Sequence, residues 1–160
     1  MRTIECTDLY GEIHNIPQEQ VILRPAAYAL VIQNGELLLV RMKSTGKYHL
    51  PGGGIEAGES TEETLVRELR EETGIEIEVG RLVHFEEVFF YYNPSGRAYQ
   101  GRHFYYLCMP KAGQVVAEDE VMDGSAERPS WVAIQNLSGE DFQILGNTIL
   151  DLCRQATQTG

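Results

Sequence analysis

The sequence predicts an α/β domain in which helices pack against a mixed β-sheet. Strand-like segments lie on both sides of one amphipathic segment near residues 60–74, and a second helical pattern closes the chain. The length of 160 residues is that of one domain, and a hydrophobic content of 42% is ordinary for a globular protein. We therefore expect a single domain over residues 1–160, with residues 1–20 forming a hairpin extension.

The composition limits the classes of partner. The formal net charge is -11, which argues against a nucleic-acid polymer as partner but not against a small anion, because a bound cation can invert the local field. No apolar run approaches the ~20 residues that span a bilayer, and residues 1–13 lack the features of a secretory signal. The dispersed cysteines Cys6, Cys108 and Cys153 suit a reduced compartment. We expect a cytoplasmic protein without a membrane partner.

The first third of the chain reads as strands. Residues 3–16 alternate polar and apolar side chains around a turn-like "DLYG", which predicts a hairpin. Residues 26–42 read as two strands joined by an Asn34-Gly35 turn, a strong short-range hairpin signal. Residues 48–59, "YHLPGGGIEAGE", predict a loop whose glycines allow unusual backbone angles.

A helix is expected to follow this loop. Ser60 and Thr61 are candidates for its N-cap, and Glu62 and Glu63 fall in the first turn, where the helix dipole favours negative charge. Gly74 is a natural residue to close the helix in a left-handed conformation.

The second half predicts three more strands and a terminal helix. Residues 76–92 and 102–109 read as strands on either side of a turn at residues 93–96, and residues 129–134 as a final short strand. A helix over residues 138–155, capped by Ser138, is indicated by apolar residues at helical spacing: Phe142, Leu145, Ile149 and Leu152.

Three glutamates share one sector of the first helix. With Glu68 set at zero, Glu72 lies at about 40° and Glu71 at about −60° around the axis. Leu65, Val66, Leu69 and Thr73 fill the adjoining sector as a stripe that faces the core, and Arg67 and Arg70 lie to either side of the acids.

One interpretation of these acids is a solvated face with Glu/Arg pairs, which accounts for Glu62 and Glu63. It accounts poorly for three carboxylates that converge with little opposing charge, since like charges repel at these spacings and oppose the dipole near the helix end. Hard divalent cations prefer oxygen ligands, and Mg²⁺ often takes few carboxylates plus water and substrate phosphate. A bound cation would remove the repulsion between Glu68, Glu71 and Glu72.

Residues 53–75, "GGIEAGESTEETLVRELREETGI", resemble the Nudix box, G-x5-E-x7-R-E-U-x-E-E-x-G-U with U aliphatic. The resemblance extends over about residues 20–155 and implies a Nudix-type α/β/α sandwich with the box as a loop-helix-loop catalytic motif. Every fixed position matches: Gly53, Glu59, Arg67, Glu68, Leu69, Glu71, Glu72, Gly74 and Ile75.

Nudix hydrolases cleave a nucleoside diphosphate linked to another group with the help of Mg²⁺ or Mn²⁺. The resemblance implies that Glu68, Glu71 and Glu72 are metal ligands, with a backbone carbonyl near Gly53. Glu59 and Arg67 would hold the loop and the helix together by a salt bridge.

The resemblance leaves the general base open between two positions. In some members it is the glutamate that corresponds to Glu68, and in others it comes from a loop before the last strand. Glu127 is our choice in that loop because it lies nearest to Trp131, although a solvated acidic loop is the alternative interpretation. The other acids of the loop are Glu118, Asp119, Glu120 and Asp123.

Cations near the box are candidates for binding substrate phosphates. Arg24, Arg41 and Lys43 lie before or at the ends of strands that should approach it, and Arg41 follows the buried run "LLLV". Ordinary solubility charges at strand ends are the alternative interpretation.

Residues 89–107 are unusually aromatic, and their rings could form core, bury a dimer contact or stack a base. In the family, tyrosines at about the distance of Tyr91 and Tyr92 from the box are associated with dinucleoside polyphosphate hydrolases. The four histidines, His14, His49, His84 and His103, show no ligand-like spacing and are interpreted as structural or surface residues.

Three functions remain in view, of which a purely structural acidic helix that serves as an interaction surface is the third. The first is a metal-dependent hydrolase of a small nucleotide, namely an NTP, a dinucleoside polyphosphate, ADP-ribose or a nucleotide sugar. The second is a catalytically silent Nudix-fold module that binds a nucleotide as a sensor; silent members usually lose a box glutamate, and this chain keeps them all. Homodimerisation is common in the family and would suit the aromatic segment.

Overall fold

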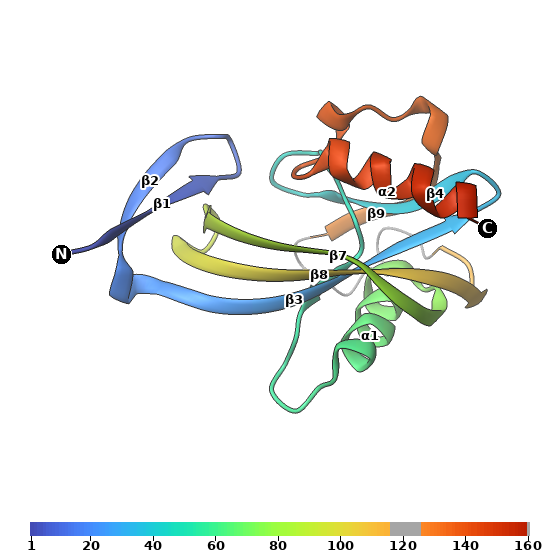
Figure 1. Ribbon diagram of the computed structural model, residues 1–160, viewed down its shortest axis with the longest axis horizontal. Helices are drawn as coiled ribbons and strands as arrows, with labels where there is room; N and C mark the ends of the chain where they lie inside the picture. Colours follow the sequence, from blue (N-terminus) through green and yellow to red (C-terminus); the bar gives the residue numbers. More distant parts are fainter. Residues whose placement is uncertain (116–125, 160) are drawn as a thin grey trace.

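Figure 1 shows the computed structural model of the chain, which describes residues 1–115 and 126–159. It confirms the expected α/β class, because helices flank a mixed, curled β-sheet. Neither of the two α-helices in these residues is long and apolar enough to cross a membrane. The helices are α1 (Thr61–Thr73) and α2 (Gly146–Thr159), with short 3-10 helices η1 (Gln18–Gln20), η3 (Ile134–Asn136) and η4 (Gly139–Asp141).

Within this part of the chain, nine strands form the sheet in the order β2-β1-β7-β8-β3-β4-β5, with β6 paired to β3 and β9 paired to β4. Strands β3 and β8 run parallel, whereas β7 and β8 form a long antiparallel pair. The strands are β1 (Thr3–Asp8), β2 (Ile13–Pro17), β3 (Val21–Gln33), β4 (Glu36–Met42), β5 (Tyr48–His49), β6 (Gly52–Gly54), β7 (Glu76–Tyr92), β8 (Arg97–Ala112) and β9 (Ala126–Ala133).

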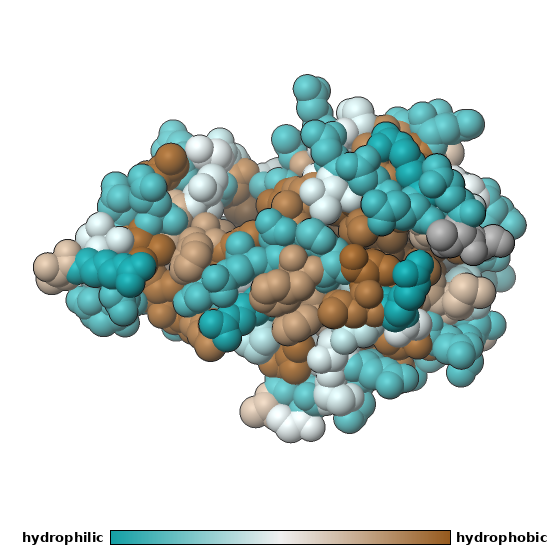
Figure 2. All heavy atoms as spheres, viewed as in Figure 1, coloured by the Kyte–Doolittle hydropathy of each residue, from teal (hydrophilic) through white to brown (hydrophobic). Residues whose placement is uncertain are grey.

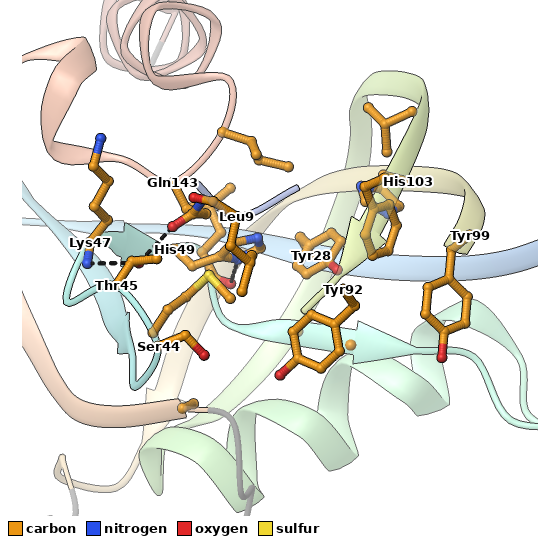
Figure 3. Close-up of a pocket in the computed structure, with 18 of the residues that line it drawn as sticks. Leu9, Tyr28, Ser44, Thr45, Lys47, His49, Tyr92, Tyr99, His103 and Gln143 are labelled. Atoms are coloured by element: carbon orange, nitrogen blue, oxygen red, sulfur yellow. Dashed lines mark hydrogen bonds between the residues drawn. The ribbon is translucent and has the colours of Figure 1, made fainter. Parts of the chain in front are cut away.

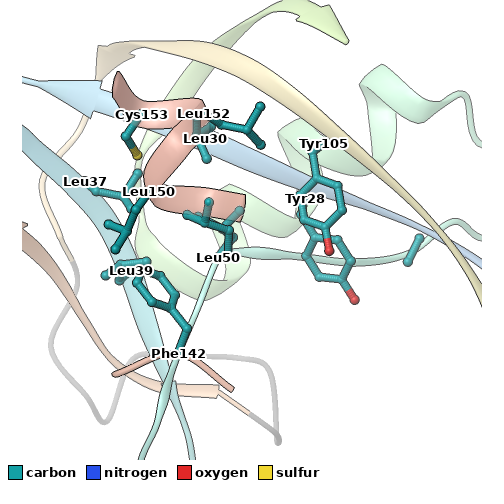
Figure 4. Packing of buried hydrophobic residues seen from close by; sticks show 12 residues of the cluster. Tyr28, Leu30, Leu37, Leu39, Leu50, Tyr105, Phe142, Leu150, Leu152 and Cys153 are labelled. Carbon is teal, nitrogen blue, oxygen red and sulfur yellow. The ribbon is translucent and has the colours of Figure 1, made fainter. Parts of the chain in front are cut away.

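The core has two halves, one on each face of the sheet. Successive residues of β3 point to opposite faces, so Tyr28 and Leu30 join a cluster with α2, while Ala29 and Val31 join a cluster with α1. Figure 4 shows the α2 half, in which Leu150, Leu152 and Cys153 meet the sheet. All three cysteines are buried free thiols, as expected for small hydrophobic residues.

Local sequence signals set the predicted turn and the first helix. Asn34 and Gly35 both have positive φ, 52° and 76°, as a two-residue turn of type I′ requires, so the β3–β4 hairpin is confirmed. The Ser60 side chain accepts a hydrogen bond from the Glu63 backbone N–H at 3.1 Å. Gly74 closes α1 in the left-handed conformation with φ 79°. The expected stripe is buried at Leu65, Leu69 and Thr73 and half-buried at Val66.

The predicted terminal helix over residues 138–155 is wrong at its start. Ser138 caps η4 instead, where its backbone N–H donates to Asp141 at 2.8 Å. Leu145 has a positive φ of 54°, which cannot continue a helix, and α2 begins only at Gly146. Phe142 is buried in the core from outside the helix.

Gly146 permits a close approach that a longer side chain would prevent. A Cβ atom at this position would lie 2.0 Å from the carbonyl oxygen of Gly139, a backbone atom that cannot move alone. We expect Gly146→Ala to lower the free energy of unfolding by about 1–3 kcal/mol, measured by urea denaturation. Gln158→Ala, at an exposed position of the same helix, serves as the control and should change it by less than about 0.5 kcal/mol; equal effects would contradict this explanation.

Two predicted strands are longer than expected. Strand β8 spans Arg97–Ala112 rather than residues 102–109, because it pairs along most of its length with β7 on one side and with β3 on the other. Strand β9 begins at Ala126 rather than at residue 129 and pairs with β4. The N-terminal segment forms an antiparallel β1–β2 hairpin, and β1 also pairs with β7 at Thr7 and Asp8.

Candidate active site

A pocket of about 1160 Å³ opens where α1, the sheet, the N-terminal hairpin and the segment Gly52–Gly54, here called the glycine loop, meet (Figure 3). Its charged end is formed by Arg24, Glu68 and Glu72 beside β6. Its aromatic end is formed by Tyr28, Phe90, Tyr99 and His103 from three neighbouring strands. In the surface view of Figure 2, the molecule is hollowed between the N-terminal hairpin and the part that carries α2.

Two of the three predicted metal ligands reach this pocket. Glu68 is 7% exposed and Glu72 is 2% exposed, and both line the pocket wall. Glu72 accepts a hydrogen bond from the Gly52 backbone N–H at 3.3 Å. The Glu68 carboxylate lies so close to Gly53 that a Cβ added there would be 2.7 Å from Oε1. The absence of a side chain at Gly53 leaves room for the Glu68 carboxylate against the loop.

Arg67 lies among the acids rather than outside their sector. Its Nη1 atom is 3.0 Å from Glu68 Oε1 and 3.3 Å from Glu71 Oε2. The expectation of little opposing charge is therefore wrong, because the long arginine side chain reaches along the helix surface to both carboxylates. Glu71, whose side chain is 34% exposed, is held by Arg67 and does not line the pocket.

The ion pair that the resemblance implies between Glu59 and Arg67 is present. Arg67 Nε donates to one Glu59 oxygen at 2.6 Å and Nη2 to the other at 3.0 Å, a two-point contact that ties the loop to the helix. Thr64, buried on α1, donates its hydroxyl to the same carboxylate at 2.9 Å. The hydrogen bond from Arg67 is the largest cause that lowers the pKa of Glu59, to about 2, and the same contact raises the pKa of Arg67.

This ion pair predicts a pH-dependent contribution to stability. The folded pKa of Glu59 is below the ordinary value of 4.5, so the contribution is complete above pH 4.5 and is lost as the pH falls towards about 2. We expect Glu59→Gln to melt below the wild type at neutral pH, with the gap closing between pH 4.5 and about 2. Thermal melts of the wild type and the variant across this pH range measure the gap. Glu62→Gln, which changes an exposed acid of α1, is the control. A gap that stays constant with pH would refute the assignment.

The donor set at the pocket fits a hard divalent cation in chemical type. Glu68 and Glu72 offer only oxygen atoms, and the β6 backbone lies beside them. Across residues 1–115 and 126–159, no three His, Cys, Asp or Glu side chains are gathered closely enough to hold a metal ion together. Because Arg67 engages Glu71 on the side away from the pocket wall, a site with all three glutamates would require Glu71 to leave Arg67.

Three of the four predicted substrate-binding residues line the pocket: Arg24, Arg41 and Tyr92. Arg41 is fixed by donating to the Gly46 carbonyl at 2.7 Å and the Tyr48 hydroxyl at 2.8 Å. Lys43 is exposed and does not line the pocket, whereas Lys47 does. Sequence reasoning missed Lys47, although it lies in the same connection between β4 and β5.

The structure places Glu127 on β9 opposite Arg41 of β4, half-buried and outside the pocket lining. The remaining acids proposed for this loop, Glu118, Asp119, Glu120 and Asp123, lie outside the described residues. Of the two base candidates within the described residues, Glu68 lines the pocket and Glu127 does not.

Two histidines whose spacing did not suggest a binding role, His49 and His103, line the pocket. His49 donates through Nδ1 to the Leu50 carbonyl at 2.7 Å, and burial lowers its pKa. His103 is 3% exposed, and burial lowers its pKa to about 4. The interpretation as structural residues fits His14 and His84, which bond Asp8 and Glu86. The missed signal was alternation along β8, which places His103 on the same face as Tyr99.

The N-terminal hairpin supplies another wall of the pocket, through residues 7–11. Asp8 fixes this turn, because its side chain accepts from the backbone N–H groups of Tyr10 and Glu12 at 2.8 and 2.9 Å. Its other oxygen contacts His14 at 2.9 Å and Asn93 at 3.1 Å, and hydrogen bonds with His14 and Asn93 hold the pKa of Asp8 well below its usual range.

The same turn is tied to the rest of the molecule through Leu9. Its backbone N–H donates to the Asn93 side chain at 3.0 Å, and its carbonyl accepts from Gln143 at 3.0 Å. Gln143 in turn accepts from the Thr45 hydroxyl at 2.6 Å, as drawn in Figure 3. The turn is thereby bound to Asn93 and Gln143 directly and to Thr45 through Gln143.

Comparison with known proteins gives a family match. The model of the NUDIX domain matches residues 22–150. A Caenorhabditis elegans protein whose name assigns it provisionally to the Nudix hydrolases is 29% identical over 137 residues, covering 81% of this chain and 34% of that protein. The NAD-capped RNA hydrolase NudC of Pseudomonas aeruginosa is 40% identical over 67 residues, covering 41% of this chain and 23% of that protein. The matched part of the chain thus spans about a third of the first of these curated relatives and about a quarter of the second.

Solved structures agree with the architecture. The crystal structure of an ADP-ribose pyrophosphatase from Streptococcus suis superimposes with a TM-score of 0.63 at 21% identity, covering 84% of this chain and 91% of that chain. At this identity the likeness concerns the fold, and it agrees with the curled sheet flanked by α1 and α2.

Proposed function

The chain belongs to the Nudix family, and from that premise we propose that it is a metal-dependent hydrolase of a nucleoside diphosphate linked to another moiety. The bond cleaved would be a phosphoanhydride, and the metal Mg²⁺ or Mn²⁺. The observation that carries the proposal is the meeting of two buried carboxylates, Glu68 and Glu72, with the glycine loop and Arg24 in one pocket.

The residues of this pocket suit phosphoanhydride hydrolysis. Glu68 and Glu72 would hold the cation, which when bound neutralises phosphate oxygens and acidifies a water molecule. Arg24, Arg41 and Lys47 line the same pocket and could bind the remaining phosphate charge. Glu59 and Arg67 would act on the reaction by positioning the helix against the loop.

We propose Glu68 as the general base, because it reaches the pocket and Glu127 does not. We expect Glu127→Gln to keep kcat within about twofold of the wild type, whereas a base normally contributes about 10²-fold or more. Steady-state kinetics at saturating metal measure this difference. A large loss of kcat in a folded Glu127→Gln protein would move the base to β9.

The proposed reaction is tested with a substrate panel in Mg²⁺ or Mn²⁺. The panel contains NTPs, ADP-ribose, nucleotide sugars and dinucleoside polyphosphates, with NAD-capped RNA added because one relative carries that name. Release of a nucleoside monophosphate or of pyrophosphate is followed by chromatography. Metal-dependent turnover of at least one small nucleotide supports the proposal, and turnover of capped RNA alone would contradict a small-molecule substrate.

A catalytically silent nucleotide-binding module is the second candidate. It is favoured by the contacts of Arg67, which engages Glu68 and Glu71 in the arrangement described here. Nucleotide binding by calorimetry without turnover of any member of the panel would support it. A rise in melting temperature on addition of Mg²⁺ is expected for either candidate and would be absent for a purely structural acidic helix.

We also propose that the chain forms a homodimer. Large apolar side chains are exposed on β7 and β8, including Phe85 at 45% and Met109 at 63%. On the face shown in Figure 2, brown apolar areas are divided by teal polar residues. Light scattering after size exclusion tests the proposal, and a mass of one chain across the concentration range would refute it.

A further inference from the structure

His103 is a buried polar side chain without a partner. It is 3% exposed, and neither ring nitrogen has a hydrogen-bond partner among the described residues. Buried polar groups in native proteins are nearly always hydrogen-bonded, so an exception in a pocket wall points to a group that arrives from outside. Figure 3 shows His103 among the side chains that line the pocket, near Tyr28.

The ring of His103 is held in a defined place. Gly101 lies beside it on β8, and a Cβ at that position would be 2.5 Å from Nε2. Tyr28 and the imidazole form a T-shaped pair with ring centres 5.1 Å apart, and the centre of the Phe90 ring lies 6.1 Å from that of the imidazole. Phe90 stacks on Tyr99 at 5.3 Å, so aromatic rings extend along this end of the pocket.

The chemistry of the aromatic end differs from that of the charged end. Burial lowers the pKa of His103 to about 4, so at neutral pH the imidazole is uncharged and offers one donor and one acceptor. Aromatic faces and edges favour a flat ring over a hydrated anion. Arg24, which belongs to the charged end, lies beside Gly54 and also beside Tyr28 of the aromatic end.

We propose that Tyr28, Phe90, Tyr99 and His103 form a subsite for the uncharged base of a nucleotide, in which His103 hydrogen-bonds the edge of the base. The inference deepens the proposed function and rests on it for the phosphates at the charged end. The hairpin turn at residues 7–11, outside the segment that matches the family, lines the same pocket.

Binding without metal tests the subsite independently of catalysis. The probes are AMP, GMP, CMP and UMP, with ribose 5-phosphate as the ligand that lacks a base, titrated by calorimetry in EDTA. At least one nucleotide is expected to bind about tenfold or more tightly than ribose 5-phosphate. His103→Phe keeps an aromatic ring but removes both nitrogens, and it should remove most of that preference while leaving binding of ribose 5-phosphate unchanged.

His84→Phe is the matched control, because His84 bonds Glu86 and does not line the pocket. It should keep the preference for the base. Equal binding of all five probes by the wild type, or a preference that survives in His103→Phe, would overturn the inference. If His103→Phe does not fold, the ¹⁵N shifts of the His103 imidazole in the wild type decide: they should move on addition of the preferred nucleotide and not on addition of ribose 5-phosphate, and unmoved shifts overturn the subsite.

The outcomes separate the two proposals. Base-selective binding without hydrolysis of the panel would retain the subsite and refute the hydrolase. Hydrolysis without base-selective binding would retain the hydrolase and refute the subsite.

Discussion

Glu72→Gln is expected to lower turnover of the preferred nucleotide by about 10²-fold or more, with little change in stability. The proposed metal is worth several kcal/mol of transition-state stabilisation, and each 1.36 kcal/mol corresponds to about tenfold in rate. The amide keeps an oxygen that can accept the 3.3 Å hydrogen bond from Gly52, so the contact between loop and helix survives. The charge that would attract the cation is lost.

Steady-state kinetics and a thermal melt on the same preparation measure both effects. Glu63→Gln is the matched control, since Glu63 is exposed on the same helix and does not line the pocket. It should retain activity close to that of the wild type. Full turnover by folded Glu72→Gln would remove Glu72 from the metal site.

Leu69→Ala is expected to have the opposite character, a large loss of stability. Leu69 is fully buried between α1 and the sheet, among residues such as Leu65 and Val31. Truncating a buried leucine to alanine leaves a cavity and costs about 2–5 kcal/mol. For a chain of this size we expect a fall in melting temperature of roughly 5–15 °C.

Leu82→Ala provides the comparison, because Leu82 is 48% exposed. It should change the free energy of unfolding by less than about 0.5 kcal/mol. Urea denaturation of the two variants gives the values directly. A melting temperature of Leu69→Ala equal to that of the wild type would mean that α1 is rotated about its axis relative to the arrangement described here.

The sequence predicted α1 well because the signals that define it are local. Ser60, Gly74 and the apolar spacing of Leu65 and Leu69 all act within the helix itself. The start of α2 was missed because its cause is tertiary: the chain turns at Leu145 so that Gly146 can lie against Gly139. Helical spacing alone carries no information about such a contact.

The candidate site also has a part that could be predicted from local sequence and a part that could not. The positions of Glu68 and Glu72 on one helix follow from the spacing of the box. The aromatic end depends on which strands become neighbours, because β8 brings His103 beside Tyr28 of β3, 75 positions earlier in the chain. The reach of Arg67 to Glu71 depends on a side-chain conformation that spacing leaves open.

The turn that contains Asp8 and Leu9 is synthesised long before the residues that hold it in place. Asn93 and Gln143, the partners of Leu9, follow it by 84 and 134 positions. During synthesis the turn can dock only after Asn93 and Gln143 have been made. The cavity is therefore completed only once the chain has been synthesised beyond Gln143. A nascent chain would acquire its helix and glycine loop long before it could enclose a ligand.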